Sequence, residues 1–440
     1  MSRLPRGLAG RMIGFYAVRD LIPLYAVYSL LFRDHGVSTG QVSTLLVIWS
    51  ITAFVMEVPS GAWADAVSRR SLLILSSLLH AVGFALWMVV PSYAGFAAGF
   101  VCWGTSSALM SGTFEALLYD ELAAHGATPS YARLMGWANS LSMVANLVGT
   151  VLAAPLFHLG GYGLVGWASV GVASLQGLLA VSLPGAPRIA DVEDVDDGRT
   201  PDVGDGLAGR YVTMLRCGLS EAMRQRTVRH AVLITALLLS FMVYDEYFAL
   251  VAREKGAATQ TVPILVGLTV AGQAIGTALA GRTARLSRRV IAGALGVAAG
   301  LMAVGMAQGR WLGFLAIGVG YGITANAVIV AEARLQDAIS GPARATVTSV
   351  TGLLSESFSV MVYAAFALGS PWVAVSTMAI ALTVPMVVVA TLIPRWLPAA
   401  RVDESEPAPN HDFGAEVSGG DSVGPGASPA AAGRGSSSQR

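Results

Sequence analysis

The chain has 440 residues, of which 54% are hydrophobic and only 12% charged, and its formal net charge is +1. Soluble globular proteins carry about 25% charged residues, so this composition indicates a membrane protein. A net charge near zero gives no reason to expect a nucleic-acid partner. The two cysteines, Cys102 and Cys217, show neither metal-ligand spacing nor a disulfide framework.

Apolar segments long enough to cross a bilayer follow one another along most of the chain. The first of them contains Arg19 and Asp20 and lacks a small-residue cleavage site, so we expect a retained helix and not a signal peptide. The twelve predicted spans are residues 10–32, 42–64, 71–91, 95–118, 134–157, 163–183, 230–252, 260–281, 290–308, 311–335, 346–368 and 371–393.

Two polar stretches interrupt this pattern. The first begins with the acidic run "DVEDVDDG" and continues as a candidate amphipathic surface helix, while the last is rich in Gly, Ser, Ala and Pro and should be disordered. The chain is therefore predicted to consist of an N-terminal six-helix half (1–183), a cytoplasmic linker (184–229), a C-terminal six-helix half (230–395) and a disordered cytoplasmic tail (396–440).

The basic residues of the short loops indicate the orientation. One set of loops is rich in arginine, whereas the opposite set holds only Arg33, Arg253, Lys255 and Arg310. Because basic loops stay in the cytoplasm, both termini and the linker are predicted to be cytoplasmic. The basic loops hold Arg69, Arg70, Arg133, Arg285, Arg288, Arg289 and Arg344.

Three short features recur at nearly equal offsets, each on the predicted cytoplasmic side. Such a recurrence indicates duplication into two parallel six-helix repeats, which place a binding cavity at their interface near mid-membrane. The paired features are "GAWADAVSRR" (61–70) with "GRTARLSRR" (281–289), "EALLYD" (115–120) with "EARLQD" (332–337), and Arg133 with Arg344.

The stretch "EVPSGAWADAVSRR" at 57–70 resembles the signature loop of the major facilitator superfamily. Gly61, Asp65, Arg69 and Arg70 match that loop, and Ser68 replaces its usual second glycine. The stretch "SGTFEALLYDEL" (111–122) is also similar to a bacterial subgroup of drug and metabolite exporters. The second copy of the loop keeps Gly281, Arg288 and Arg289 but has Arg285 where the first has Asp65.

The resemblance implies an all-α integral membrane fold, with twelve transmembrane helices in two pseudo-symmetric six-helix halves. It also implies a functional monomer in the bacterial plasma membrane, driven by a proton gradient and without a cofactor or metal. In this family the signature loop acts as a cytoplasmic gate, which holds the halves together when the transporter faces outward. Arg69 would pair there with an acid on the fourth helix, for which Asp120 is the candidate.

Charged residues within the predicted spans mark candidate functional sites, because charges in a membrane are costly and usually face a cavity. Arg19 and Asp20 lie near the middle of the first span and Glu356 near the middle of the eleventh. The remaining candidates are Asp245 and Glu246 towards the outer side, and Glu57, Glu115 and Glu332 near the cytoplasmic ends of their helices.

These carboxylates allow two interpretations. Desolvation opposes ionisation in mid-membrane, so Asp20 or Glu356 could be reversibly protonated for coupling. Alternatively, these charges could form permanent structural ion pairs, for example between Arg19 and an acid on another helix. Asp245 and Glu246 are adjacent, about 100° apart on a helix, so at most one is expected to point straight into the cavity.

The repeated hexapeptide is expected to serve two separate roles. Its Glu and Asp lie on different faces of a helix, so Glu115 and Asp120 should not share one site. We expect the Glu to face the bundle and the Asp to face the loop of its own half. In the second half, Asp337 could then pair with Arg285, Arg288 or Arg289.

The leading functional hypothesis is proton-coupled export of a small, largely apolar compound, a drug or a metabolite, by alternating access. The stretch "GTVLAAPLFHLGG" at 149–161 partly resembles the helix-5 pattern of the family's antiporters, with Ala154-Pro155 in place of Gly-Pro. A small-residue packing face explains it equally well, so export and import stay open at this point. An importer or facilitator of a small nutrient is the alternative. An integral-membrane transferase is remote, because the spans contain no clustered carboxylates or histidines of the kind that enzyme chemistry needs.

Overall fold

A computed structural model describes residues 7–185, 225–339 and 344–400, and within these ranges every regular element is a helix. A bilayer favours this result, because a helix satisfies its backbone hydrogen bonds internally. Most of the predicted linker helix and of the predicted disordered tail lies outside the described residues, but residues 225–229 and 396–400 are described. The side chains of Val58, Ala62, Ala64, Asp65, Ala66 and Ala345 also lie outside them.

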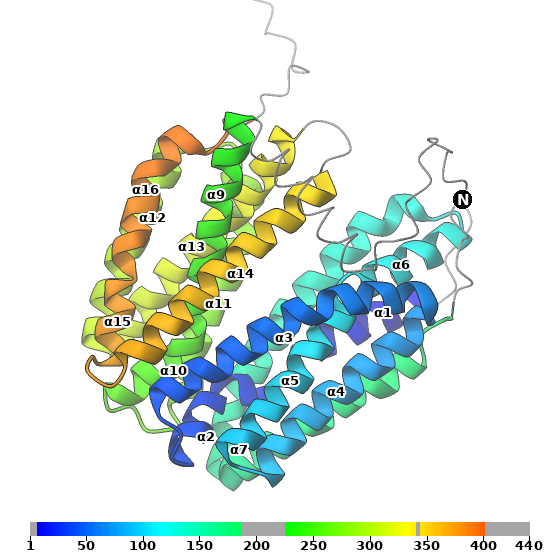
Figure 1. Cartoon of the computed structure of the whole chain (residues 1–440), viewed down its shortest axis with the longest axis horizontal. Coiled ribbons are helices and arrows are strands. Elements are labelled where there is room, and N and C mark those ends of the chain that lie inside the picture. Colours follow the sequence, from blue (N-terminus) through cyan, green and yellow to red (C-terminus); the bar gives the residue numbers. More distant parts are fainter. Residues whose placement is uncertain (1–6, 186–224, 340–343, 401–440) are drawn as a thin grey trace, which may run out of the picture. The chain divides into compact units, whose positions relative to one another are not determined.

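The helices of the first half form one bundle (Figure 1). α4 and α5 pack against each other, α3 packs against α5, and α1 and α4 pack against α7. The elements are α1 (Leu8–Val18), a 3-10 turn (Pro23–Ala26), α2 (Tyr28–Asp34), α3 (Thr39–Ala66), α4 (Arg69–Val89), α5 (Tyr93–Met110), α6 (Thr113–Ala124), a second 3-10 turn (Thr128–Ser130) and α7 (Tyr131–Val181).

The helices of the second half form another bundle, built around the α11–α13 and α12–α13 contacts. Its first helix starts at Arg226, inside the segment predicted as linker. The elements are α9 (Arg226–Ser240), a 3-10 turn (Phe241–Tyr244), α10 (Asp245–Glu254), α11 (Val262–Thr283), α12 (Arg288–Gln308), α13 (Trp311–Ala338), α14 (Arg344–Gly369), α15 (Val375–Ala381) and α16 (Thr383–Trp396).

Ten stretches of the described chain are long and apolar enough to cross a membrane. One of them, Thr128–Val181, contains two predicted spans, because the helical φ/ψ values are interrupted at Gly160 and Gly161. The fourth predicted span is not among the ten stretches. It falls on α5 and α6, where glycine and serine lower the hydropathy and the helix is interrupted. The arrangement agrees with the predicted twelve-helix fold.

Four predicted spans are broken helices, and the twelfth span is interrupted only at Leu382, between α15 and α16. The first breaks after Val18, because Pro23 lacks an N–H and clashes with the carbonyl group four residues earlier. The fourth breaks at Gly112, whose positive φ of 70° favours glycine. The seventh changes from α9 to a 3-10 turn at Phe241 and resumes as an α-helix at Asp245. Broken membrane helices expose backbone where they line a cavity.

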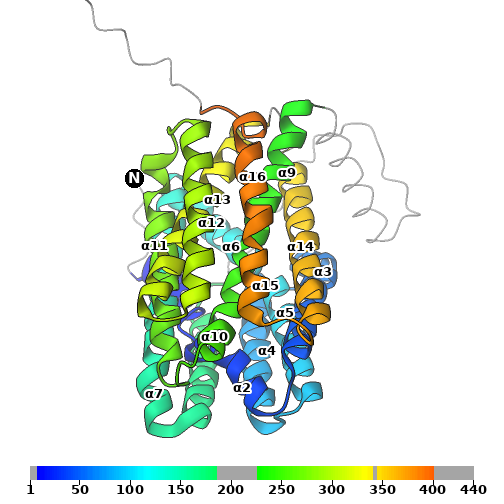
Figure 2. The same cartoon turned by 90° about the vertical axis from the view of Figure 1, so that its left-hand side faces the viewer.

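The two ends of the molecule differ in how the halves meet. We name the end that carries Arg69 and Arg288 the basic end, and the end that carries Asp34 and Arg253 the opposite end. Figure 1 shows α6 and α16 well separated at the basic end, whereas α2 and α10 approach at the opposite end, which Figure 2 shows from the side. α2 and α10 are in contact.

The buried apolar clusters follow the same division. The largest cluster draws buried residues from both halves, such as Phe32 and Phe248. Near the basic end each half has its own cluster, one around Phe114 in the first half and one around Leu335 in the second. The two halves therefore share a core at the opposite end and have separate cores at the basic end.

Polar contacts join the halves at the opposite end. Arg253 forms an ion pair with Asp34 at 3.0 Å, and the Tyr162 hydroxyl donates to the other oxygen of Asp34 at 2.7 Å. α3 and α14 approach closely at Gly40, where a Cβ atom would lie 2.7 Å from the carbonyl oxygen of Ala367. This end of the interface is closed.

Candidate functional site

A cavity of about 530 Å³ lies between the two halves. The broken helices supply much of its polar lining, because three of the breaks bring several side chains to the cavity. The break in the first span contributes Arg19 and Asp20, the break in the fourth contributes Ser111 and Gly112 with Glu115 close behind, and the break in the seventh contributes Asp245 and Glu246.

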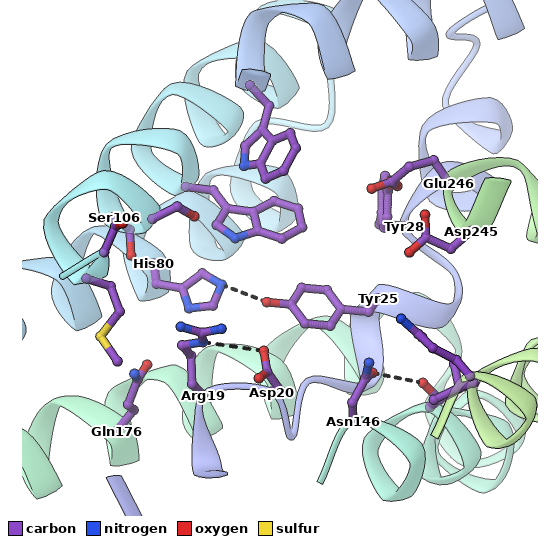
Figure 3. Close-up of a pocket in the computed structure, with 18 of the residues that line it drawn as sticks. Arg19, Asp20, Tyr25, Tyr28, His80, Ser106, Asn146, Gln176, Asp245 and Glu246 are labelled. Atoms are coloured by element: carbon purple, nitrogen blue, oxygen red, sulfur yellow. Dashed lines mark hydrogen bonds and ion pairs between the residues drawn. The ribbon is translucent and has the colours of Figure 1, made fainter. Parts of the chain in front are cut away.

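Arg19 and Asp20 interact with each other in the cavity wall. The Nε atom of Arg19 lies 3.5 Å from an oxygen of Asp20, and the Ser142 hydroxyl donates a hydrogen bond to the other Asp20 oxygen. The Arg19 guanidinium also lies over the Tyr16 ring, 5.1 Å from its centroid. All these partners lie in the first half, and Figure 3 shows the Arg19–Asp20 pair. The acid that contacts Arg19 is thus its sequence neighbour and not an acid on another helix, and the coupling role of Asp20 stays a prediction.

An aromatic wall lies beside this pair. Trp103 stacks on Tyr25 with ring centroids 5.2 Å apart, and Trp49 packs on Trp103 at 5.6 Å. The hydroxyl of Tyr25 is hydrogen-bonded to Nε2 of His80 at 3.3 Å, and the His80 ring lies 5.9 Å from that of Trp103. The sequence did not distinguish these residues, because aromatic side chains in membrane spans are usually part of the packing.

Asp245 and Glu246 both line the cavity, contrary to the expectation that only one would do so. Both residues lie in α10 and remain about 100° apart around it, so the central cavity meets both directions. α10 continues directly from the 3-10 turn, whose carbonyl oxygens already accept the Asp245 N–H. The hydroxyl of Tyr28, from the first half, donates a hydrogen bond to Glu246.

Glu115 lines the same cavity from α6. One of its carboxylate oxygens, Oε2, is buried and has no hydrogen-bond partner among the described residues, and the same holds for Nε1 of Trp49. Buried polar atoms are costly without a partner. The cavity therefore presents one acceptor and one donor that the described protein does not satisfy.

Glu356 lies elsewhere. Together with Glu57 it lines a second cavity of about 530 Å³ between α3 and α14, whereas Asp20 lines the central one. The Ser50 hydroxyl donates to Glu356 at 2.5 Å and so joins the two halves. The sequence placed Asp20 and Glu356 at similar depth, but depth alone does not show which face of a helix meets which cavity.

The signature loop of the first half forms the predicted ion pair. Arg69 contacts the carboxylate of Asp120 and also donates to the carbonyl oxygen of Ala116 at 3.0 Å. Arg70 donates to the carbonyl oxygen of Val181. All these partners lie in the first half, so the loop makes no described contact across to the second half in this conformation.

In the second half, the loop at 281–289 is held by a different residue. Arg334, within the "EARLQD" repeat, donates to the carbonyl oxygens of Ala284 at 2.9 Å and Leu286 at 2.5 Å. Asp337 is exposed, and in the described part of the chain it forms no ion pair, so the expected pairing with Arg285, Arg288 or Arg289 is wrong. Arg288 donates instead to the carbonyl oxygen of Leu397 at 3.4 Å, and Arg285 and Arg289 are exposed.

Four further gate candidates have open surroundings at the basic end: Gly61, Gly281, Arg285 and Arg289. A Cβ atom on Gly61 or Gly281 would meet nothing within 4 Å, and the side chains of Arg285 and Arg289 are exposed. Glu332 is half-buried in α13. Close packing therefore does not require glycine at 61 or 281 in this conformation.

Helical bundles in two halves around a central cavity define a multi-pass membrane protein of the transporter class. Residues 7–363 match the family model of the Major Facilitator Superfamily, and the chain belongs to that family. It is therefore a transporter and not an enzyme, and no curated protein sequence matches it.

Solved transporters share this fold at low sequence identity. A mutant of the nucleoside transporter NupG is 13% identical with a TM-score of 0.67, and the match covers 88% of this chain and 98% of that one. A D-xylose–proton symporter is 13% identical with a TM-score of 0.64, covering 90% and 97%. A bacterial homologue of the human lysosomal transporter Spinster, inward-facing and occupied, is 14% identical with a TM-score of 0.64, covering 89% and 96%.

Proposed function

We propose that the chain is a proton-coupled secondary transporter that exports a small polar solute from a bacterial cell by alternating access. The observation that carries this proposal is the central cavity, which both halves line and which holds four carboxylates, those of Asp20, Glu115, Asp245 and Glu246. Carboxylates in a low-dielectric cavity can exchange a proton. A proton gradient can then drive the solute through the same site.

The conformation supports the alternating part of the proposal. The halves share a core at the opposite end and have separate cores at the basic end. If the basic end is cytoplasmic, as the positive-inside rule predicts, this conformation faces inward. Arg69 is bonded within the first half in this conformation. In the outward-facing state the loop would meet the second half, and the unpacked Gly61 and Gly281 fit that role.

The lining favours a more polar solute than the largely apolar compound that the sequence predicts. Hydroxyl and amide side chains from α4, α5, α7 and α11 face the cavity, among them Ser76, Ser106, Asn146, Gln176 and Gln273. The aromatic wall around Trp103 offers a flat surface for a ring. Each such side chain can hydrogen-bond a polar group, which suits a small solute with a ring and several polar atoms.

Import of a nutrient is a second candidate, because the same hydroxyl and amide lining also suits a polar nutrient. The two candidates differ in the sign of coupling. An exporter exchanges solute for protons in opposite directions, whereas a proton-coupled importer moves them in the same direction.

A vesicle assay tests the proposal and separates the two candidates. Everted vesicles from overexpressing cells are acidified by respiration, and a pH-sensitive dye reports the internal pH while a panel of polar, cationic and apolar solutes is added. Proton–solute exchange predicts that a substrate partly dissipates the gradient. No response to any solute, compared with vesicles that lack the protein, contradicts export. Acidification of the lumen of right-side-out vesicles on solute entry would instead indicate import.

A further inference from the structure

The charges of the central cavity are unbalanced. Its lining holds four carboxylates but one permanent cation, Arg19. That cation is already engaged by Asp20 and by the Tyr16 ring. In the described part of the chain, no basic side chain lies within ion-pair distance of Glu115, Asp245 or Glu246. Unpaired charges are costly away from water, so these carboxylates favour a ligand that brings positive charge.

Aromatic rings lie in the same cavity as these carboxylates. Tyr25, Tyr28, Trp49 and Trp103 all line it, and Trp103 lies 5.2 Å from Tyr25, 5.6 Å from Trp49 and 6.4 Å from Tyr28, measured between ring centroids. Ring faces attract organic cations, most strongly when the cation is desolvated. Rings combined with carboxylates provide both parts of an ammonium-binding site.

Two unsatisfied atoms in the lining add detail. Oε2 of Glu115 needs a hydrogen-bond donor, which a protonated amine supplies, and Nε1 of Trp49 needs an acceptor. In the view of Figure 3, Tyr25 lies between Arg19 and the pair formed by Asp245 and Glu246. The cavity therefore contains an acidic region, at Asp245 and Glu246, that Arg19 does not neutralise and that can bind the cationic group of a ligand.

We infer that the cavity binds an organic cation, an amine or quaternary ammonium compound that carries an aromatic ring and a hydrogen-bond acceptor. The inference rests on the proposed transport function and specifies its substrate class. The ammonium group binds between the ring faces and the carboxylates of Asp245 and Glu246. The ring of the solute stacks on the wall formed by Trp103 and Tyr25.

The test is binding of three probes that share a phenyl ring and differ in charge: benzyltrimethylammonium, benzyl alcohol and benzoate. Isothermal titration calorimetry on the purified full-length protein in a non-ionic detergent gives the dissociation constants, with empty micelles as the blank. We expect saturable binding of the cation, at least about tenfold tighter than that of either other probe. Equal or tighter binding of benzyl alcohol or benzoate, or no saturable binding of the cation, overturns the inference.

Variants locate the site. Asp245→Asn and Glu246→Gln should each weaken cation binding by about tenfold, since each removes a carboxylate that lines the cavity. Trp103→Leu should weaken binding of the cation more than binding of the alcohol. Glu254→Gln is the matched control, because Glu254 bonds Ser376 outside the cavity. Full cation affinity in Asp245→Asn and Glu246→Gln together would also overturn the inference.

The outcome is separable from the proposed function. Binding is measured without a membrane gradient, so a failure of proton coupling does not change the result. A neutral substrate that moves protons in the vesicle assay would support the transport proposal and overturn the cation inference.

Discussion

The hydroxyl of Tyr28 donates a hydrogen bond to the carboxylate of Glu246, and this bond joins the first half of the chain to the second inside the central cavity. Tyr28 follows the break in the first span and Glu246 lies in the first turn of α10. A contact across the cavity between two broken helices must change when the halves move. Protonation or ligand binding at Glu246 can therefore affect how the halves meet.

A double-mutant cycle tests this bond. Tyr28→Phe and Glu246→Gln should each lower the initial rate of solute-driven proton flux by about tenfold, which corresponds to roughly 1.4 kcal/mol. The double variant should be no slower than the slower single variant, because both remove one interaction. Tyr93→Phe is the control, since Tyr93 bonds Thr44 within the first half. Additive effects of the two variants would show that the residues act independently.

The ion pair between Asp34 and Arg253 should hold the opposite end closed. Both side chains are more than a third exposed, so the pair contributes roughly 0.2–1 kcal/mol. Asp34→Asn should then open this end about two- to fivefold more often. The readout is labelling of Ser43→Cys by a membrane-impermeant maleimide, in a background of Cys102→Ser and Cys217→Ser. Ser43 is fully buried at the interface with Tyr247, so its labelling reports opening.

High salt provides the control for this second prediction. Screening weakens an exposed ion pair, so salt should speed labelling of the unmodified Asp34 protein and hardly affect the Asp34→Asn protein. Equal labelling of both proteins at low salt would mean that the ion pair does not stabilise closure.

Gly40 should matter because two helices from different halves approach there. A Cβ atom at this position would lie 2.7 Å from the carbonyl oxygen of Ala367 and 2.9 Å from the Ser370 hydroxyl, so Gly40→Ala forces α3 away from α14. Overpacking of this kind costs about 1–3 kcal/mol. The thermal midpoint of the purified protein should fall, and labelling of Ser43→Cys should rise. Gly10→Ala is the matched control, because a Cβ on Gly10 meets nothing within 4 Å; the same loss in both variants would contradict the prediction.

The two loops at the basic end should differ in their effect on stability. Arg334 is 3% exposed and donates to several backbone carbonyl oxygens, whereas Arg69 is partly exposed and pairs with Asp120. Arg334→Gln removes these hydrogen bonds to partly buried carbonyl groups, at about 0.5–1.5 kcal/mol for each bond. Its thermal midpoint should be clearly lower than that of Arg69→Gln. Equal midpoints would mean that the Arg334 bonds add little in the folded protein.

The sequence predicted the helical fold and part of the site, for reasons that the structure makes clear. The Arg69–Asp120 ion pair could be predicted because Arg69 lies in the signature loop and Asp120 lies in the repeated hexapeptide at the same end of a neighbouring helix. Two helix breaks are also marked in the sequence. Pro23, shortly after Arg19 and Asp20, marks the break in the first span, and Gly112 marks the break in the fourth. Local chemistry causes these features, so local sequence reveals them.

Other features depend on tertiary contacts that local sequence does not encode. No proline or glycine marks the break before Asp245, and a cavity that meets both Asp245 and Glu246 depends on how the two halves pack. The sequence did not indicate the role of Arg334, because its donors reach loop carbonyl groups that only the folded second half brings close. The aromatic wall at Trp103 likewise combines side chains from three separate helical segments.

Concentrative transport tests the central claim most directly. The purified full-length protein is reconstituted in proteoliposomes with an imposed pH gradient, and accumulation of a solute identified in the vesicle screen is measured with and without a protonophore. The account predicts accumulation above equilibrium that the protonophore abolishes, and only equilibration in the protein carrying both Asp245→Asn and Glu246→Gln. Accumulation that persists in that double variant, or a wild-type protein that never exceeds equilibrium under the gradient, would contradict it.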